Sequence, residues 1–209
     1  MNVIALIPAK GNSRRLPNKN LLPCAGVPLV TRAIRCAKDA GIFSQIVVST
    51  DSPEIAAIAK EEGDIRVLWR PAILCADGVE WAAVVSHFLA TWNYHMDAFA
   101  VLPPTTPTRT AFQLRARFKE FVQQGNHGYL ATLNFRGQCD GDTVFCTPER
   151  FLKLLQFPWS DAAGAYIQLE QAVDINTAED LARAEAMLKL WPVEEIIDRN
   201  YKKLGVDPI

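Results

Sequence analysis

The sequence predicts an α/β fold, a three-layer sandwich in which helices cover both faces of a mostly parallel (mixed) sheet. The first observation is that short apolar or β-branched segments alternate with segments whose apolar residues recur at helical spacing. The second is that polar clusters follow several predicted strands, and sheets of this class bind ligands beyond the carboxyl ends of their strands. A length of 209 residues, 49% of them hydrophobic, fits one domain, 1–209, with a sizeable core.

The opening segments are predicted as strand, helix and strand. Val3–Ile7 is apolar throughout, which is typical of a buried strand. Residues 29–40 have apolar side chains at helical spacing and are followed by Gly41, a natural position for a glycine after a helix. Residues 45–50 are β-branched and apolar, so they form the second predicted strand.

The next helix is predicted over residues 53–62, because a proline stands in its first turn and a capping residue precedes it. Either Asp51 or Ser52 supplies that cap. A short strand at 67–69 and a helix at 80–92 follow, which continues the strand–helix alternation.

Residues 98–102 form another predicted buried strand, and residues 110–124 form the helix after it. This helix should turn its phenylalanine and leucine side chains inward. Its cations should point outward, namely Arg115, Arg117 and Lys119. A further strand is predicted at 129–133.

The last third of the chain is less regular. Residues 134–163, rich in Gly, Asp and aromatic residues, are expected to form a variable excursion with a hairpin and a short helix over one rim. Asp174–Asn176 is expected to close the last strand. Thr177 then begins a helix with a capping-box pattern that reaches about Leu190, and residues 193–204 form a final short helix.

The loop after the first strand gathers four cations within ten residues, Lys10, Arg14, Arg15 and Lys19. Gly11 lets the backbone approach a ligand closely, and Asn12 and Ser13 tolerate turn conformations. Such crowded cations repel one another unless an anion lies among them, and a nucleotide triphosphate is the simplest candidate. The alternative is an ordinary solvated basic loop. The patterns of P-loops and of dinucleotide-binding folds are both absent from this segment.

The overall composition excludes several classes of partner. The formal net charge is −1, so neither nucleic acid nor an anionic membrane is expected as a partner. No apolar stretch reaches the roughly 18 residues that span a bilayer, and no signal-peptide pattern is seen near the start. The odd number of cysteines fits reduced thiols in a cytoplasmic protein, with a Cys139–Cys146 pair across a hairpin as the alternative.

Residues 8–20, Pro-Ala-Lys-Gly-Asn-Ser-Arg-Arg-Leu-Pro-Asn-Lys-Asn, resemble the signature loop of the acylneuraminate cytidylyltransferases. Those enzymes activate sialic, pseudaminic, legionaminic and related acidic sugars as CMP conjugates. Later stretches agree in order and kind, at residues 48–56, 70–77, 102–109 and 174–181. The resemblance implies a Rossmann-like fold of the nucleotide-diphospho-sugar transferase type. It also implies transfer of CMP from CTP to an acidic sugar, with release of pyrophosphate.

The resemblance also implies the residues of the site. Lys10 and Lys19 occupy positions where the family has phosphate-contacting cations, and they are the expected catalytic residues. The other expected nucleotide-binding residues are Ala9, Gly11, Asn12, Ser13, Arg14, Asn20, Arg70 and Asp77. The expected sugar-binding residues are Thr105, Thr106 and Arg109. Asp77 can instead be an exposed loop carboxylate.

A Mg²⁺ ion is the implied cofactor, with Asp174 and Asn176 as its expected ligands. Asn176 stands where the family has a second carboxylate. Asp174 can instead end a strand or cap the following helix. Asp51 likewise either contacts the nucleotide or caps a helix.

Two further hypotheses stay open beside a cytidylyltransferase. Pro103 replaces the glutamine of most relatives, which leaves room for a nucleotidyltransferase that uses another nucleotide or sugar. Asn176 leaves room for a nucleotide-binding protein without turnover. The expected partners are CTP and an acidic sugar, and a homodimer is an open alternative.

Overall fold

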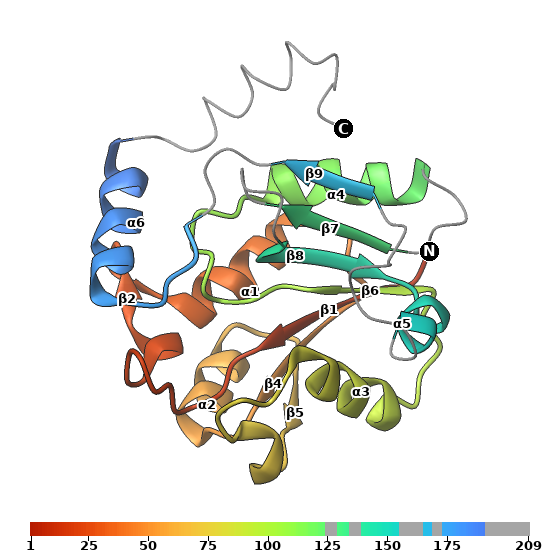
Figure 1. Cartoon of the computed structure of the whole chain (residues 1–209), viewed down its shortest axis with the longest axis horizontal. Coiled ribbons are helices and arrows are strands. Elements are labelled where there is room, and N and C mark those ends of the chain that lie inside the picture. The colour runs from red at the N-terminus through yellow and green to blue at the C-terminus, as the bar shows by residue number, and fades with distance from the viewer. Residues whose placement is uncertain (124–128, 134–138, 155–164, 169–172, 191–209) are drawn as a thin grey trace.

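Within the described residues, seven strands form one sheet in the order β5–β4–β1–β6–β8–β7–β9 (Figure 1). The structure, a computed structural model, describes residues 1–123, 129–133, 139–154, 165–168 and 173–190. The strands are β1 (Val3–Pro8), β4 (Gln45–Thr50), β5 (Ile65–Trp69), β6 (Ala98–Val101), β7 (Tyr129–Leu133), β8 (Cys139–Cys146) and β9 (Ala165–Gln168). Only β8 runs antiparallel to its neighbours among these pairings, so the predicted mostly parallel, mixed sheet is confirmed.

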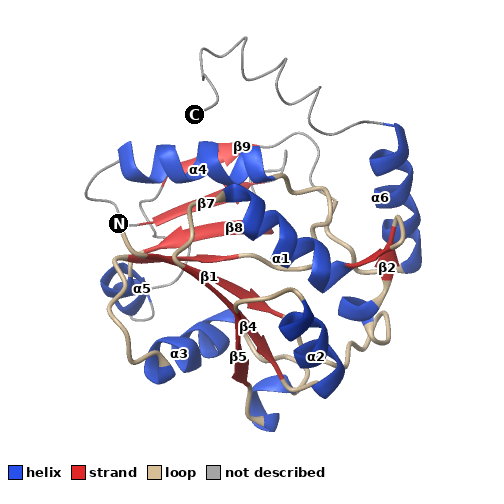
Figure 2. Ribbon diagram, turned by 180° about the vertical axis from the view of Figure 1, so that it is seen from behind, coloured by secondary structure: helices blue, strands red, loops and turns tan. Residues whose placement is uncertain are grey.

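Helices cover both faces of this sheet, which confirms the three layers (Figure 2). One face packs against α1 (Leu29–Ala40), α2 (Pro53–Glu61) and α4 (Ala111–Gln123). The other face packs against α3 (Trp81–Thr91) and α5 (Pro148–Leu154).

The central strand β1 is apolar throughout because both of its faces are buried. Val3, Ala5 and Ile7 point to the α1 side, whereas Ile4 and Leu6 point to the α3 side. All five side chains are at most 2% exposed. Continuous hydrophobicity of this kind is typical of a parallel strand between two helical layers.

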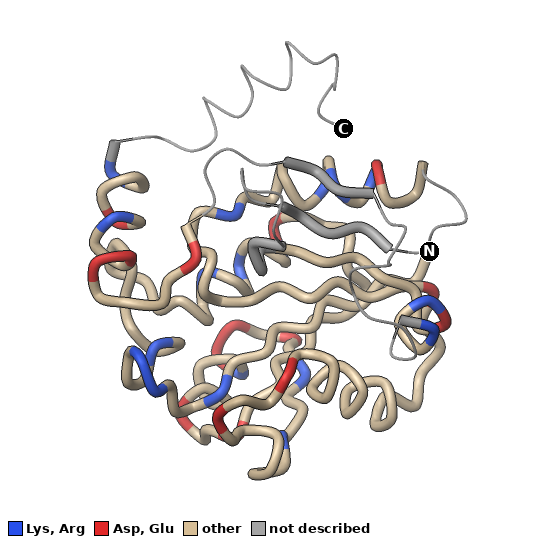
Figure 3. The backbone as a smooth tube through the Cα atoms, viewed as in Figure 1, with Lys and Arg blue, Asp and Glu red and all other residues tan. Residues whose placement is uncertain are grey.

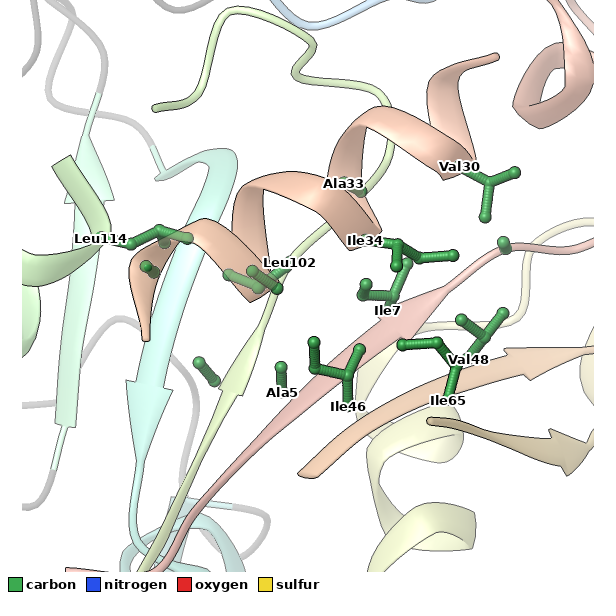
Figure 4. Packing of buried hydrophobic residues seen from close by; sticks show 14 of the residues in the cluster. Ala5, Ile7, Val30, Ala33, Ile34, Ile46, Val48, Ile65, Leu102 and Leu114 are labelled. Atoms are coloured by element: carbon green, nitrogen blue, oxygen red, sulfur yellow. The ribbon is translucent and has the colours of Figure 1, made fainter. Parts of the chain in front are cut away.

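The helix α1 has one apolar stripe, and its members recur at three- and four-residue spacing. Val30, Ala33, Ile34 and Ala37 pack onto the sheet, as the close view of this core shows (Figure 4). The helix ends where Gly41 adopts a left-handed conformation with φ of 66°. The predicted boundaries of this helix are therefore confirmed.

A smaller hydrophobic cluster lies beside the end of the sheet from which the loop of residues 9–20 leaves β1. It joins α6 (Ala178–Leu190) to the hairpin of β2 (Pro23–Cys24) and β3 (Val27–Pro28). Its buried members are Cys24, Leu29, Val173, Ile175 and Ala184. Two short 3₁₀ helices are η1 (Lys19–Leu21) and η2 (Ala72–Cys75).

The prediction that Arg117 points outward from its helix is wrong. Arg117 is 1% exposed, and its NH1 donates to Thr143 Oγ1 at 2.8 Å. The same hydroxyl oxygen accepts from Arg109 Nε at 3.1 Å. A buried hydrogen-bonded arginine thus takes a position that the helical pattern alone assigns to the surface.

The excursion does not lie over a rim, as predicted, but enters the sheet. In its described part, residues 139–154, α5 is the expected short helix, and β8 lies between β6 and β7 within the sheet. β8 pairs with β7, which precedes the excursion, so this pair is not the hairpin predicted within residues 134–163. Cys139 and Cys146 stand at the two ends of β8. Seven residue steps along an extended strand put them about 23 Å apart, far beyond disulfide reach.

Residues 173–176 are irregular, and the segment that links them to β9 lies outside the described residues. The Ile175 N–H donates to the Thr105 carbonyl at 2.8 Å, which ties this segment to the loop after β6. The capping box is confirmed, since the Asp180 N–H donates to Thr177 Oγ1 and the Thr177 N–H donates to Asp180 Oδ2. The predicted helix at 193–204 lies outside the described residues.

Candidate active site

The basic loop, residues 9–20, leaves the carboxyl end of β1 and is fastened to its neighbours by backbone groups. The Ala9 N–H donates to the Ser49 carbonyl at 2.9 Å. Asn20, 5% exposed, donates from Nδ2 to the Lys10 carbonyl at 2.9 Å, so it braces the loop from within. The start and the end of the loop are therefore held together.

Gly11 meets the turn after β4 at very close range. A Cβ atom at this position would lie 2.8 Å from Ser52 Cβ, so no larger residue fits without a shift. In this structure the backbone at Gly11 comes close to the turn after β4. The Gly11 N–H donates to Asp51 Oδ1 at 2.7 Å.

Ser52, and not Asp51, caps the helix α2. Its Oγ accepts from the Ile55 N–H at 3.2 Å. Asp51 is left facing the basic loop, a role that sequence reasoning missed. The only available signal was that two adjacent polar residues competed for one cap.

Lys10 and Arg14 share one carboxylate. Lys10 Nζ lies 3.4 Å from Asp77 Oδ1, and Arg14 Nε lies 3.2 Å from Asp77 Oδ2. Lys10 Nζ also donates to the Cys75 carbonyl at 3.4 Å. In Figure 3 cationic and acidic positions accordingly lie side by side at this end of the molecule. Exposed pairs of this kind contribute little stability.

Lys19 faces the opposite side of the loop. Its Nζ donates to the Ile175 carbonyl at 2.7 Å. Burial lowers the pKa of Lys19 below its ordinary value of 10.5, and the negative charge of Asp174 opposes that shift. Lys10 and Lys19 therefore contact different neighbours on the two flanks of the loop.

Asp174 is an exposed carboxylate beside this lysine. Its Oδ2 accepts from Asn176 Nδ2 at 2.7 Å, so the side-chain amide of Asn176 turns its nitrogen toward the carboxylate. Asp180 binds the N–H groups of Asn176 and Thr177, and these bonds lower its pKa. No cluster of three or more His, Cys, Asp or Glu side chains that could hold a metal occurs in the described ranges.

Arg70 lies beneath the loop rather than within it. It is 8% exposed, and it donates from Nε to Ser49 Oγ at 3.2 Å and from NH2 to the Ser49 carbonyl at 3.0 Å. Burial lowers the pKa of Arg70, and its interactions with the Cys75 thiol group and the Asp51 carboxylate oppose that shift. This cation supports the edge of the sheet on which the loop rests.

The predicted sugar-binding residues lie in the loop after β6. Arg109 is 6% exposed and donates from NH2 to the Pro103 carbonyl at 2.9 Å, so it holds the loop in shape. Thr105 is half-buried, and its carbonyl accepts from Ile175. Thr106 is 3% exposed, and within the described part its Oγ1 has no hydrogen-bond partner.

The remaining loop residues differ in exposure. Asn12, Arg14 and Arg15 are exposed, whereas Ser13 is half-buried. The residues after β1, β4 and β6 thus meet at one edge of the sheet, as the sequence predicted, and the residues after β5 join them. None of the helices in the described ranges is long and apolar enough to cross a membrane.

The chain is similar to known proteins. The profile of the Cytidylyltransferase family matches residues 4–135. The pseudaminic acid cytidylyltransferase of Campylobacter jejuni serotype O:2 is 30% identical over 138 residues, which cover 65% of this chain and 60% of that protein. The N-acylneuraminate cytidylyltransferase of Escherichia coli O18:K1:H7 is 36% identical over 107 residues, which cover 51% and 25%. The matches thus span less than two thirds of the length of either relative.

Solved structures share the fold at low sequence identity. A CMP:2-keto-3-deoxy-manno-octonic acid synthetase complexed with CTP has a TM-score of 0.73 at 12% identity, covering 91% of this chain and 99% of that one. A cytidylyltransferase from Leptospira borgpetersenii has a TM-score of 0.70 at 19% identity, covering 100% and 99%. The fold is that of the nucleotide-diphospho-sugar transferases. Because the family profile covers more than half of the residues, the chain belongs to the cytidylyltransferase family.

Proposed function

We propose that this protein is a nucleotidyltransferase that moves CMP from CTP onto an acidic sugar of the sialic, pseudaminic or legionaminic acid type and releases pyrophosphate. One observation carries the proposal. The basic loop is fastened at the carboxyl edge of the sheet, and Lys10 and Lys19 stand at its two flanks. The family membership and the relatives named as cytidylyltransferases for such sugars support the same choice of substrates.

The reaction is a displacement at the α-phosphorus of CTP by a sugar hydroxyl. The phosphorus is shielded by negative oxygens, so the protein accelerates the step by alignment and by neutralising charge on the departing pyrophosphate. Lys10, Lys19 and Arg14 are the proposed source of that neutralisation. CTP takes the place of Asp77 on Lys10 and Arg14, while Asn12 and Ser13 offer further donors to the phosphates.

Asp174 fits a Mg²⁺ site only together with the nucleotide. A Mg²⁺ ion accepts one or two carboxylates and completes its shell with water and phosphate oxygens, and Asp174 is exposed toward Lys19. When bound, such an ion would add positive charge on the phosphates. The Asn176 amide orients the carboxylate through its Nδ2, and its carbonyl oxygen is the second proposed ligand.

The sugar is proposed to lie against the loop after β6. The Thr106 hydroxyl is buried without a partner in the described part of the chain, and a buried hydroxyl of this kind gains from a hydrogen bond to a ligand. Thr105 lies beside it. Arg109 shapes the loop through the Pro103 carbonyl, and we propose that it acts on the sugar through that shape.

The test is pyrophosphate release from CTP and Mg²⁺ with a panel of sialic, pseudaminic, legionaminic and 3-deoxy-manno-octulosonic acids. The variants Lys10→Ala and Lys19→Ala should each lower the rate by about a hundredfold, as loss of a transition-state donor does. Arg15→Ala, which removes an exposed cation of the same loop, should change it by less than about twofold. No release with any sugar would contradict the proposal.

A second candidate function is nucleotide binding without turnover. The observation that favours it is the Asn176 amide nitrogen directed at Asp174, because an amide brings no negative charge to a metal. This candidate predicts that CTP raises the melting temperature while no pyrophosphate forms with any sugar of the panel. Asn176→Asp should then be the variant that gains metal binding.

A further inference from the structure

Asp51 lies immediately after β4 and contacts the basic loop instead of its own helix. Its Oδ1 accepts the Gly11 N–H at 2.7 Å in a partly buried position. The helix α2 does not need Asp51, since Ser52 already caps it. A hydrogen bond from a backbone N–H to a carboxylate is among the stronger kinds in proteins.

The position of Gly11 is set from two directions. The hydrogen bond pulls its backbone toward Asp51, and contact with Ser52 stops it, since a Cβ on Gly11 would come within 2.8 Å of Ser52 Cβ. Lys10 and Asn12 are the adjacent residues of the chain. The position of Gly11 therefore sets the positions of Lys10 and Asn12 relative to an incoming phosphate.

The surroundings of Asp51 contain charges of both signs. Arg70 lies close to Asp51. The Asp51 charge raises the pKa of Arg70, whereas burial lowers it. The pKa of the Cys75 thiol is raised by burial and then by the charge of Asp51. The carbonyl of Cys75 in turn accepts from Lys10. A carboxylate at this point would repel a triphosphate, so its use must lie in the hydrogen bond.

We propose that Asp51 is a positioning residue that holds the Gly11 N–H and so sets where Lys10 and the following N–H groups meet a triphosphate. The inference deepens the proposed function and rests on it for the ligand. The geometry of the loop, however, can be measured without any ligand. The Gly11 N–H acts as an anchor of the loop in this arrangement.

Three substitutions separate the acceptor atom from the charge. Asp51→Ala removes both, and Asp51→Asn keeps an oxygen in the same place without the charge. Asp51→Glu keeps the charge but moves the oxygen by one methylene group. Ser52→Ala is the matched control, because it removes the cap of α2 while its Cβ still contacts Gly11.

The first measurement is amide hydrogen exchange over residues 9–20 of the full chain without nucleotide. Asp51→Ala and Asp51→Glu should speed exchange in this loop by about tenfold, the effect of one hydrogen bond to a charged group. Asp51→Asn should restore slow exchange. Ser52→Ala should lower the melting temperature but leave exchange in the loop as in the parent protein.

The second measurement is the dissociation constant for CTP by titration calorimetry. It should rise about tenfold in Asp51→Ala and Asp51→Glu and return to within about threefold of the parent value in Asp51→Asn. The Ser52→Ala value should stay within about twofold. If CTP binds to none of the proteins, the proposed function fails, and the exchange data still decide the role of Asp51.

Two outcomes would overturn the proposal. In the first, exchange over residues 9–20 is as fast in Asp51→Asn as in Asp51→Ala. The charge of Asp51, and not its acceptor oxygen, would then hold the loop. Unchanged exchange in all three variants would show that the loop does not depend on Asp51. Should Asp51→Ala fail to fold, the comparison of Asp51→Asn with Asp51→Glu makes the same distinction.

Discussion

Burial lowers the pKa of Lys19, and this shift gives CTP binding a pH dependence. Asp174 and Asp180 oppose the shift, whereas Arg15 and Lys10 add to it. A bound triphosphate favours the charged ammonium, so CTP should raise this pKa and be bound with uptake of a proton. Affinity should therefore fall as the pH rises toward 10.5.

Lys19→Arg should keep its affinity over this alkaline range better than the parent protein, because a guanidinium stays protonated. Titration calorimetry with CTP at a series of pH values measures the difference. Superimposable pH profiles would show that Lys19 does not contact the triphosphate.

Gly11→Ala tests the close contact between the basic loop and the turn after β4. The new methyl group would meet Ser52 Cβ at 2.8 Å, so the loop must move. We expect a loss of about 1–3 kcal/mol in the free energy of unfolding, typical of overpacking, measured by urea denaturation. The dissociation constant for CTP should rise in the same protein.

Gly41→Ala is the control for that substitution. Gly41 has φ of 66° and no atom within 4 Å of the added Cβ, so its cost is backbone strain far from the basic loop. CTP binding should be unaffected there. If Gly11→Ala kept the stability and the CTP affinity of the parent protein, the close contact between Gly11 and Ser52 would be contradicted.

The individual residues of the site were predictable from the sequence by type but not by role. Crowded cations predict an anion site, and Lys10 and Lys19 stand on the two flanks of the basic loop. The engagement of Arg109 with Pro103 and Thr143 was not predictable, because Thr143 comes from a distant strand. Hydrogen-bond partners far apart in sequence leave no periodic signal.

At the scale of elements, the turn between β2 and β3 carries a local strain. Ala25 has φ of 48°, a left-handed conformation that costs a residue with a side chain about 1 kcal/mol. Its N–H donates to Glu185 Oε1 at 3.0 Å, which holds the turn against α6. Ala25→Gly keeps that N–H and removes the strain.

Ala25→Gly should therefore raise the melting temperature by about 2–4 °C, the shift expected for about 1 kcal/mol in a chain of this size. Differential scanning calorimetry measures it. Ala76→Gly is the matched control, since Ala76 is exposed with φ of −59° and should gain nothing. A melting temperature that falls in Ala25→Gly would count against the strained turn.

Elements with a clear period were predictable almost to the residue. The helix at 29–40 and the strands at 45–50 and 129–133 have the predicted bounds, because apolar spacing and the glycine after the helix mark them. The place of β8 between β6 and β7 was not predictable. Strand order depends on pairing across the sheet, which apolar periodicity does not encode.

At the scale of the whole molecule, the basic loop links two parts of the fold. Lys10 reaches the segment after β5, and Lys19 reaches the segment before α6. CTP should therefore slow amide exchange both in residues 9–20 and in residues 173–177. The helix α4, on the α1 face of the sheet, should exchange at an unchanged rate.

If CTP slowed amide exchange only in residues 9–20, the segment around Asp174 would not be part of the nucleotide site. The overall arrangement was predictable because parallel strands bring their carboxyl ends to one edge. The irregular path of residues 173–176 was not predictable from the sequence. Val173 and Ile175 are buried at the two-residue spacing of a strand, yet they do not belong to one.

The most direct test of the account is a crystal structure of the protein soaked with CTP. We expect the triphosphate inside residues 9–20, with Lys10 Nζ and Lys19 Nζ on its oxygens and Asp77 released from Arg14. A nucleotide bound elsewhere, with the basic loop still paired to Asp77, would contradict the central claim.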